Sequence, residues 1–323
     1  MSDKTIRGLG CLDILFTNVR RYRQSDKAKA LYEFTASFPR LAPLNALLVH
    51  IQKPYSRMVA TAIDWKLKYG RKLKFNATPL IILWPFGPVN FVFDISDTEE
   101  TENASEIPEE ILKPFQPQGY LPNSTLRYIY ENLPALGILE TRVNLGALAG
   151  GSIQPMRGQY YQRSCGNNVK ILYAIKLRRD IDELSRFSIL VHELGHLYCG
   201  HLNAGGKDKR FPARAELYQK ERKEKIIIQE FEAESVAWLV CRRLGLDAPA
   251  DLYLSSYWKE KDKELPEISL NTIFWAAGKI ETLCKQQYET PREFSLELGT
   301  PEANGYREWD EYDFLHEKSL PKI

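Results

Sequence analysis

Residues 191–201 read VHELGHLYCGH, and this stretch decides the fold of the second half of the chain. It contains His192, Glu193 and His196 in the pattern HExxH. Residues four apart on an α-helix lie about 40° apart around its axis, so both imidazoles face one metal ion. In a chain with 5 histidines in 323 residues, about 0.01 accidental matches are expected. The motif therefore predicts one zinc ion held by the two histidines, with Glu193 as the general base.

A catalytic zinc needs a third protein ligand, and residues 229–240, QEFEAESVAWLV, offer carboxylates for it. On a helix, Glu230 and Glu234 share one face, whereas Glu232 points about 160° away from Glu234. We assign Glu230 as the third ligand and Glu234 as an acceptor for a ligand histidine N–H, and an exchange of these two roles stays open. The alternative is an acidic helix surface, but the apolar neighbours indicate burial, and buried carboxylates need partners.

Three other residues near the motif are weaker candidates. His201 follows His196 by five residues, about 140° round a continuing helix, so we interpret it as a helix-terminal histidine that does not bind the metal. Cys165, in the segment RSCGNN, is a candidate gating thiol that reaches the zinc and blocks the water position. A loop thiol without a role is the alternative, and Cys199 is predicted to be a packed thiol.

Hydrophobic patterns along the chain predict an α+β fold. Helices are expected within 13–36 and at 124–132, 180–202, 221–244, 250–259 and 269–287, and strands at 80–84, 89–95, 159–162 and 169–177. Asp180 with Glu183 predicts the start of the motif helix, and the glycines of residues 146–158 predict a turn. We expect the strand at 169–177 to pair with an extended peptide and to lay its carbonyl over the metal.

Charge divides the chain unevenly. Residues 1–90 carry 15 Lys and Arg against 5 Asp and Glu, a net charge of +10, so residues 91–323 sum to −8. A basic module favours an anionic partner such as nucleic acid, and docking on the acidic part of the same chain is the alternative. Residues 94–110 hold eight acidic residues and no basic one, which predicts a surface linker. We hypothesise that this linker occupies the basic groove as a phosphate mimic.

The linker predicts a domain boundary near residue 105. We therefore expect a basic domain at residues 1–105, a domain with the metal motif at 106–287, and an acidic extension at 288–323.

Residues 57–75, RMVATAIDWKLKYGRKLKF, interleave cations with aromatic rings. Cations for phosphates and rings for base stacking are typical of a groove for single-stranded nucleic acid. The alternative is a helix–turn–strand element whose rings sit in the core and whose lysines are merely solvated. The candidate nucleic-acid-binding residues are Trp65, Lys66, Lys68, Tyr69, Arg71, Lys72 and Lys74.

Two resemblances to known families follow from these motifs. HELGH followed by ExxAxxxA, here Glu230, Ala233 and Ala237, resembles the ImmA/IrrE-type zinc metallopeptidases. The wider layout resembles ArdC-type antirestriction proteins, which join an N-terminal single-stranded-DNA-binding domain to a C-terminal zincin-like domain. The similar runs are DWKLKYGRKLKFNATPLIILWP, FVFDISDT, YAIKLRRD before HELGH, and YLSSYWKEKDKELPEISLNTIFWAAGKIETL, which together span most of residues 40–287.

The resemblance implies a small basic N-terminal α/β domain and a zincin-like metallopeptidase domain, with an active-site helix, an edge strand and a second helix that bears the glutamate ligand. It also implies that His192, His196 and Glu230 bind one zinc ion, with Glu193 as general base. This gluzincin-like set is the one that the spacing of the residues predicts.

These features predict a zinc-dependent endopeptidase that cleaves a specific regulatory protein, such as a transcriptional repressor, and that is regulated by single-stranded DNA. The alternative is an ArdC-like DNA-binding antirestriction or defence protein in which the zinc is mainly structural. A third interpretation is a peptidase that recognises protein partners only.

The sequence also bears on location. The longest apolar stretch, residues 79–93, is interrupted by prolines and a glycine, and the N-terminus lacks the apolar core of a signal peptide. The five cysteines are scattered, with no CxxC pair. We expect a cytoplasmic protein with reduced thiols and no membrane partner.

Overall fold

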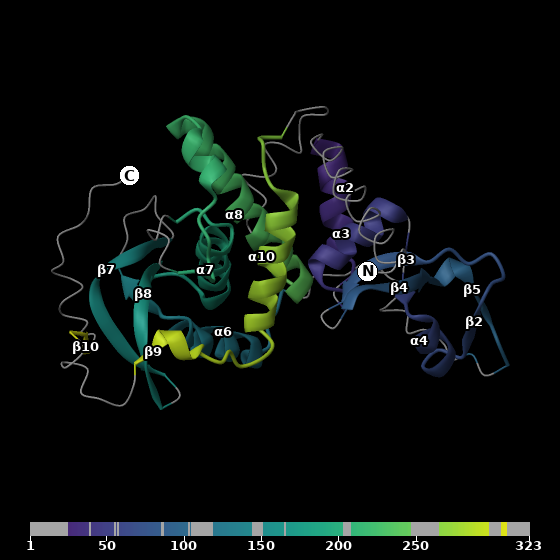
Figure 1. Cartoon of the computed structure of the whole chain (residues 1–323), viewed down its shortest axis with the longest axis horizontal. Helices are drawn as coiled ribbons and strands as arrows, with labels where there is room; N and C mark the ends of the chain where they lie inside the picture. The colour runs from purple at the N-terminus through teal and green to yellow at the C-terminus, as the bar shows by residue number, and fades with distance from the viewer. Residues whose placement is uncertain are drawn as a thin grey trace, which may run out of the picture. The chain divides into compact units, whose positions relative to one another are not determined.

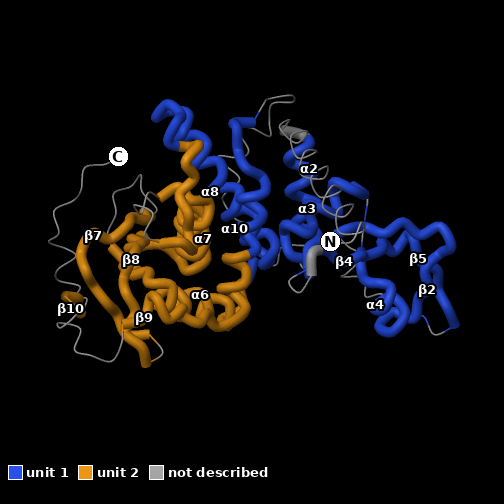
Figure 2. Tube along the Cα trace, in the orientation of Figure 1, with its two compact units in different colours: residues 1–120, 218–278 blue, residues 121–217, 279–323 orange. Residues whose placement is uncertain are grey.

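The computed structural model of the chain contains helices and sheets, which confirms the α+β class (Figure 1). Its backbone forms two compact units, each made from two separate stretches of sequence (Figure 2). The first unit comprises residues 1–120 and 218–278, and the second comprises residues 121–217 and 279–323.

The structure describes residues 25–38, 40–54, 56, 58–84, 87–102, 104, 119–143, 151–164, 166–202, 208–246, 265–296 and 305–308. The domain boundary expected near residue 105, the helix expected at 250–259 and the candidate gating thiol Cys165 lie outside these residues. Within them, no helix has both the length and the apolar character that a membrane span requires.

The helices of the first unit share buried side chains. They are α2 (Ser25–Ala36), α3 (Pro43–Gln52), α8 (Arg222–Leu244) and most of α10 (Leu270–Leu283). The ring of Tyr32 lies 6.0 Å from that of Trp238 and 5.7 Å from that of Phe274. The buried guanidinium of Arg243 donates to carbonyl groups at and after the end of α2. The acceptors are the oxygens of Thr35, Phe38 and Leu41, at 2.6, 2.8 and 2.7 Å. Helix α2 is thereby attached to α8 far along the chain, and α8 ends at Gly245 (φ +97°), as predicted.

The predicted hairpin is confirmed. It consists of β3 (Leu80–Trp84) and β4 (Gly87–Asp94), which form a sheet of order β1-β4-β3 with β1 (Val59–Ala60) among the described strands. Leu80 pairs with Val92, and both side chains are buried in a cluster with Val49 of α3.

The outer edge of β3 is covered by two amide side chains of α3. Gln52 donates to the carbonyl oxygen of Ile81 and accepts from its N–H, both at 2.8 Å. Asn45 forms the same pair of bonds with Leu83, at 3.1 and 2.9 Å. Because the polar groups of this edge are satisfied from within the chain, it is closed to pairing with another strand.

Residues 57–75, called the basic segment below, contain α4 (Ala62–Leu67) and β2 (Arg71–Leu73). Strand β2 pairs antiparallel with β5 (Thr98–Glu100), which follows the short helix η2 (Ile95–Asp97) in the acidic segment 94–110. The linker predicted at residues 94–110 is therefore wrong for its first residues. Asp94 accepts a hydrogen bond from Ser96 N at 3.0 Å, and the Thr98 hydroxyl donates to Ile95 O at 2.8 Å, so local hydrogen bonds and the β2 pairing hold this part of the segment.

The second unit is built on a sheet of order β10-β7-β8-β6, with helix α6 (Asn123–Ala135) packed beside β6, as expected for residues 124–132. The strands are β6 (Ile138–Val143), β7 (Gly151–Ser164), β8 (Asn167–Arg178), β9 (Ser295–Leu296), which also pairs with β8, and β10 (Arg307–Glu308). β8 is parallel to β6 and antiparallel to β7. The turn predicted at 146–158 is wrong for residues 151–158, because pairing with β8 draws them into β7.

Helix α7 (Glu183–Tyr198) carries the HExxH motif. It begins after Asp182, whose carboxylate accepts hydrogen bonds from Ser185 N and Oγ at 2.9 and 2.6 Å. The predicted cap Asp180 is held instead in an ion pair with Arg178 at 2.7 Å. The helix ends before the predicted residue 202, because Gly200 takes a left-handed conformation with φ +72°.

Candidate metal centre and nucleic-acid interface

One side of helix α7 is buried in the core, and the motif histidines lie on another side. Leu190 and Leu194 are fully buried, whereas His192 and His196 are half-buried. The Nε2 atoms of the two histidines lie 3.1 Å apart. Two nitrogens bound at about 2.05 Å to a tetrahedral zinc lie about 3.3 Å apart. The two imidazoles are therefore already spaced to hold one ion.

Glu230 of α8 belongs to the same group of metal-binding residue types. One ligand atom from each of His192, His196 and Glu230 lies within 4.8 Å of the others, and Glu234 is not part of this group. Two imidazole nitrogens and one carboxylate oxygen are the ligand chemistry of catalytic zinc sites, which keep a fourth position open. The types of these three residues therefore fit a zinc ion.

A second group of metal-binding residue types follows the motif. Cys199, His201 and Glu232 are all buried, and one ligand atom from each lies within 4.8 Å of the others. The Glu232 carboxylate also accepts a hydrogen bond from Ser269 N at 2.7 Å. The sequence pattern does not predict that Glu232 lies near Cys199 and His201. The local signal that bears on His201 is Gly200, because a glycine after a helix commonly reverses the chain.

Glu193 is buried, and its carboxylate faces the first residue of β7. A Cβ atom built on Gly151 would lie 3.1 Å from Glu193 Oε1 and 2.6 Å from Cγ2 of Ile189. Only a residue without a side chain allows the backbone to approach this closely. The strand therefore forms one wall around the carboxylate with its backbone alone.

The edge-strand role predicted for residues 169–177 is wrong. These residues belong to β8, which is enclosed between β6 and β7 and also pairs with β9. Among the described strands, β7 has an open edge on the side away from β8. On that side β10 pairs at Tyr160 and Tyr161, and within the described residues no strand pairs with residues 151–158 there. A partner strand placed on this edge would run past Gly151 and the Glu193 carboxylate.

The aromatic side chains of the basic segment are not arranged as the predicted nucleic-acid groove requires. Trp65 is fully buried, and its indole N–H donates to Phe93 O at 2.8 Å. Tyr69 packs on it, with ring centroids 5.2 Å apart. The Trp65 ring is therefore not available for stacking on a base, because the core already covers it. Phe75, two residues after β2, is instead completely exposed.

Most of the predicted cations have acidic or carbonyl partners. The contacts are Lys68 with Asp64 at 2.7 Å, Arg71 with Glu100 at 2.7 Å, Lys72 with Glu99 at 3.2 Å, and Lys74 with Ser96 O at 2.8 Å. The hydrogen bond from Lys68 lowers the pKa of Asp64 and raises that of Lys68. Glu99 and Glu100 belong to β5, so the acidic segment lies directly along the basic strand β2.

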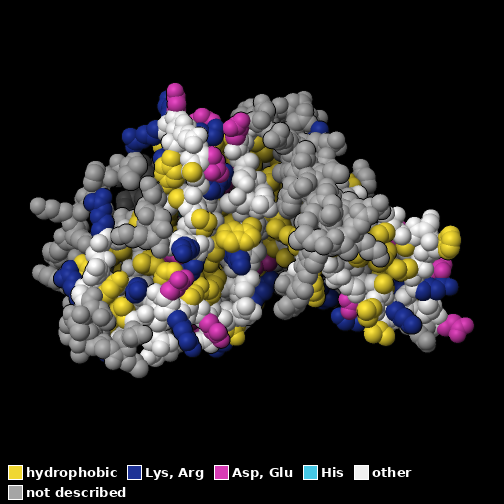
Figure 3. Space-filling model, in the orientation of Figure 1, with side chains coloured by type: hydrophobic (Ala, Val, Ile, Leu, Met, Phe, Trp, Pro, Cys, Tyr) yellow, Lys and Arg dark blue, Asp and Glu magenta, His cyan; other side chains and the backbone are white. Residues whose placement is uncertain are grey.

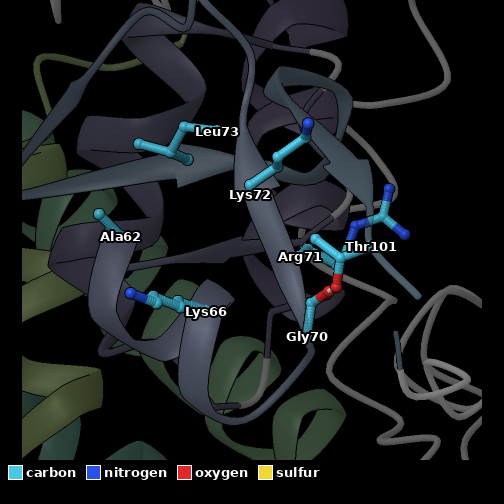
Figure 4. A pocket seen from close by; sticks show the side chains of 7 residues that line it. All are labelled: Ala62, Lys66, Gly70, Arg71, Lys72, Leu73 and Thr101. Carbon is cyan, nitrogen blue, oxygen red and sulfur yellow. Dashed lines mark hydrogen bonds between the residues drawn. The ribbon is translucent and has the colours of Figure 1, made fainter. Parts of the chain in front are cut away.

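A pocket of about 430 Å³ lies between α4 and β2. Its lining residues are Ala62, Lys66, Gly70, Arg71, Lys72, Leu73 and Thr101 (Figure 4). The side chains of Lys66, Arg71 and Lys72 point in different directions, so the pocket does not gather its cations on one phosphate. Ile63 and Leu67, which also belong to α4, have 69% and 75% of their surface exposed. Hydrophobic and charged side chains are interspersed over the α4, β2 and β5 region at the right of Figure 3.

Comparison with known proteins adds no relative. No family model matches the chain, and neither a curated protein nor a solved structure matches it. The roles of the candidate metal centre and of the basic surface are therefore inferred from their residues and geometry.

Proposed function

We propose that the chain is a zinc-dependent endopeptidase that cleaves a specific regulatory protein, such as a transcriptional repressor. One observation carries the proposal, namely the grouping of His192, His196 and Glu230 with Glu193 on the same helix as the histidines. Three protein ligands leave a fourth zinc position for water, which is the mark of a catalytic site as opposed to a structural one. The resemblance of HELGH and Glu230 to ImmA/IrrE-type peptidases supports the same activity, which we place in the cytoplasm.

In the proposed mechanism, some residues of the site bind the metal and another transfers a proton. His192 and His196 would hold the ion through Nε2, and Glu230 would hold it through a carboxylate oxygen. Zinc, when bound, supplies Lewis-acid activation of water and of a peptide carbonyl. Glu193 accepts the proton of the attacking water and passes it to the leaving amine. Glu234 is proposed to accept the N–H of a ligand histidine.

Strand β7 is the proposed binding strand for the substrate. Its free edge at residues 151–158 begins beside Glu193, so an extended peptide that pairs there brings its backbone to the general base. Main-chain pairing of this kind supplies affinity without sequence preference, and specificity then comes from side-chain pockets on either side.

The experiment that tests the proposal compares the wild-type chain with Glu193→Gln. Each protein is added to a cell lysate, and new protein N-termini are identified by mass spectrometry while zinc content is measured on the same samples. Products that appear with the wild type and vanish with the variant, at equal zinc content, support the proposal.

Gly151→Ala is expected to reduce cleavage by up to about 100-fold, which is the cost of misplacing a catalytic group by about 1 Å. The added methyl group would lie 2.6 Å from Cγ2 of Ile189, which must move, and 3.1 Å from both Glu193 Oε1 and Lys176 O, so it crowds the carboxylate. We expect the zinc content to stay at one ion per chain, since no ligand is touched. Gly278→Ala is the matched control, because a Cβ atom there lies in ordinary contact with Pro43, at 3.4 Å from its Cδ. Equal loss of activity in both variants would contradict the role of the close approach.

A second function is favoured by the basic surface. Exposed Phe75, Ile63 and Leu67 accompany cations on α4 and β2, and such a surface suits single-stranded DNA. The chain would then be an ArdC-like DNA-binding antirestriction or defence protein with a mainly structural zinc. In that case Glu193→Gln retains function in cells, whereas an endopeptidase loses it. If both sites act together, DNA binding regulates the peptidase.

The acidic strand β5 is proposed to compete with DNA for β2. We expect Glu99→Gln/Glu100→Gln to tighten single-stranded DNA binding about tenfold at low salt, because two surface ion pairs of up to about 1 kcal/mol each no longer oppose it. Fluorescence anisotropy of a labelled oligonucleotide at two salt concentrations measures this.

The matched control for this experiment is Glu33→Gln/Glu131→Gln, which makes the same change of charge on α2 and α6. An affinity that rises equally in the control would show a general charge effect. An unchanged affinity in the β5 variant would contradict the competition, and absence of binding at low salt in all proteins would contradict the DNA interface.

A further inference from the structure

The end of α7 reverses the chain directly after the metal motif. Gly200 has φ +72° and donates its N–H to Leu197 O at 3.1 Å, and His201 N donates to His196 O at 3.0 Å. These two bonds form the Schellman arrangement, in which the residue after the left-handed glycine returns to the last turn of the helix. A Cβ atom at Gly200 would lie 2.5 Å from Pro212 O, so the following loop also requires glycine here.

This reversal brings His201 back onto His196. On a continuing helix the two side chains would diverge by about 140°. In the structure their ring centroids lie 5.1 Å apart, and Nδ1 of His196 lies 3.0 Å from Nδ1 of His201. In a Schellman arrangement these two positions commonly make a hydrophobic contact. Here two imidazoles take that place, and His201 is buried, with 6% of its surface exposed.

The two nitrogens of His196 have different neighbours. Nε2 lies 3.1 Å from Nε2 of His192, on the side of the proposed metal, and Nδ1 faces His201. An imidazole that binds a metal through Nε2 carries its proton on Nδ1, so this N–H must donate. Nδ1 of His201 lies at hydrogen-bond distance, 3.0 Å, and can accept this bond. His201 then carries its own proton on Nε2.

We propose that His201 is a positioning residue for the metal ligand His196. By accepting the Nδ1–H bond it holds the ring so that Nε2 points at the ion, and it makes that nitrogen a better donor. This inference rests on the proposed zinc centre, and it assigns the histidine next to the motif a role that is distinct from ligation.

The test compares two substitutions at this position in the full-length chain. His201→Phe keeps a planar ring but removes the acceptor, and the zinc dissociation constant, measured by competition with a chromophoric chelator, is expected to rise 10- to 100-fold. His201→Asn places its Oδ1 where Nδ1 of histidine lies, and is expected to restore most of the affinity. If His201→Phe does not fold, His201→Ala serves in its place.

A second readout separates positioning from general stability. The visible absorption spectrum of the cobalt-substituted protein reports ligand geometry, and we expect it to change in His201→Phe and to resemble wild type in His201→Asn. The unfolding temperature of the metal-free proteins should be similar in both variants.

Three results would overturn the inference. Equal zinc affinity and an unchanged cobalt spectrum in His201→Phe would mean that the contact does not orient His196. Affinity lost equally in the Phe and Asn variants would remove the role of the acceptor. Two zinc ions per wild-type chain, falling to one in His201→Phe, would make His201 a ligand of a second ion with Cys199 and Glu232. A wild-type chain without zinc would instead refute the proposed function itself.

Discussion

Glu193→Gln is expected to abolish cleavage while one zinc ion per chain remains bound. The amide has nearly the shape of the carboxylate, so it leaves the buried space beside Gly151 filled, but it cannot accept a proton from water. Loss of general base catalysis costs about 10²- to 10⁴-fold in rate. The measurement is the initial rate of product formation from a substrate found in the lysate, with zinc content determined by mass spectrometry of the metal.

Glu131→Gln, an exposed change of the same kind on α6, is the control and should keep the wild-type rate. If Glu193→Gln still cleaves at a rate within a few-fold of wild type, Glu193 is not the base and the mechanism is refuted. If cleavage and zinc are lost together, the residue supports the metal site, and the proton-transfer role has no support.

Glu230→Ala is expected to remove zinc from the purified protein, whereas Glu234→Ala is expected to weaken it only. Glu230 supplies one of three proposed ligand atoms, so its loss leaves two imidazoles and should lower affinity by more than the 10- to 100-fold that is typical for an outer hydrogen-bond partner. Chelator competition at fixed pH measures both dissociation constants. The two variants are a matched pair, because they make the same truncation one helical turn apart on α8.

This pair of variants also decides which of Glu230 and Glu234 is the zinc ligand, a question that the sequence leaves open. Affinity lost mainly in Glu234→Ala would make Glu234 the ligand and would contradict the grouping with His192 and His196. Equal and small losses in both variants would mean that neither carboxylate binds the ion.

The part of the proposed metal centre on α7 follows from local spacing in the sequence. His192 and His196 share a side of α7 because the helical repeat sets which residues face together, and Glu193 is their neighbour for the same reason. The end of α8 at Gly245 and the hairpin β3–β4 are equally local, since each depends on a few adjacent residues. These predictions need only the residues within one or two turns of each position.

Contacts between distant residues decided what the local patterns could not. The sequence predicts that Trp65 stacks on a base. In the structure its indole N–H donates to the carbonyl oxygen of Phe93 in β4, and the core covers its ring. Residues 169–177 read as a free strand, yet β6 and β7 flank them. His201 lies on the wrong side of an ideal helix, yet the chain reverses at Gly200, where the carbonyl oxygen of Pro212 leaves no room for a side chain, and this reversal brings His201 onto His196. Helical period and composition describe residues that are neighbours along the chain. Which strands pair, which carbonyl accepts the N–H of a buried side chain and where the chain reverses depend on residues that meet only after folding.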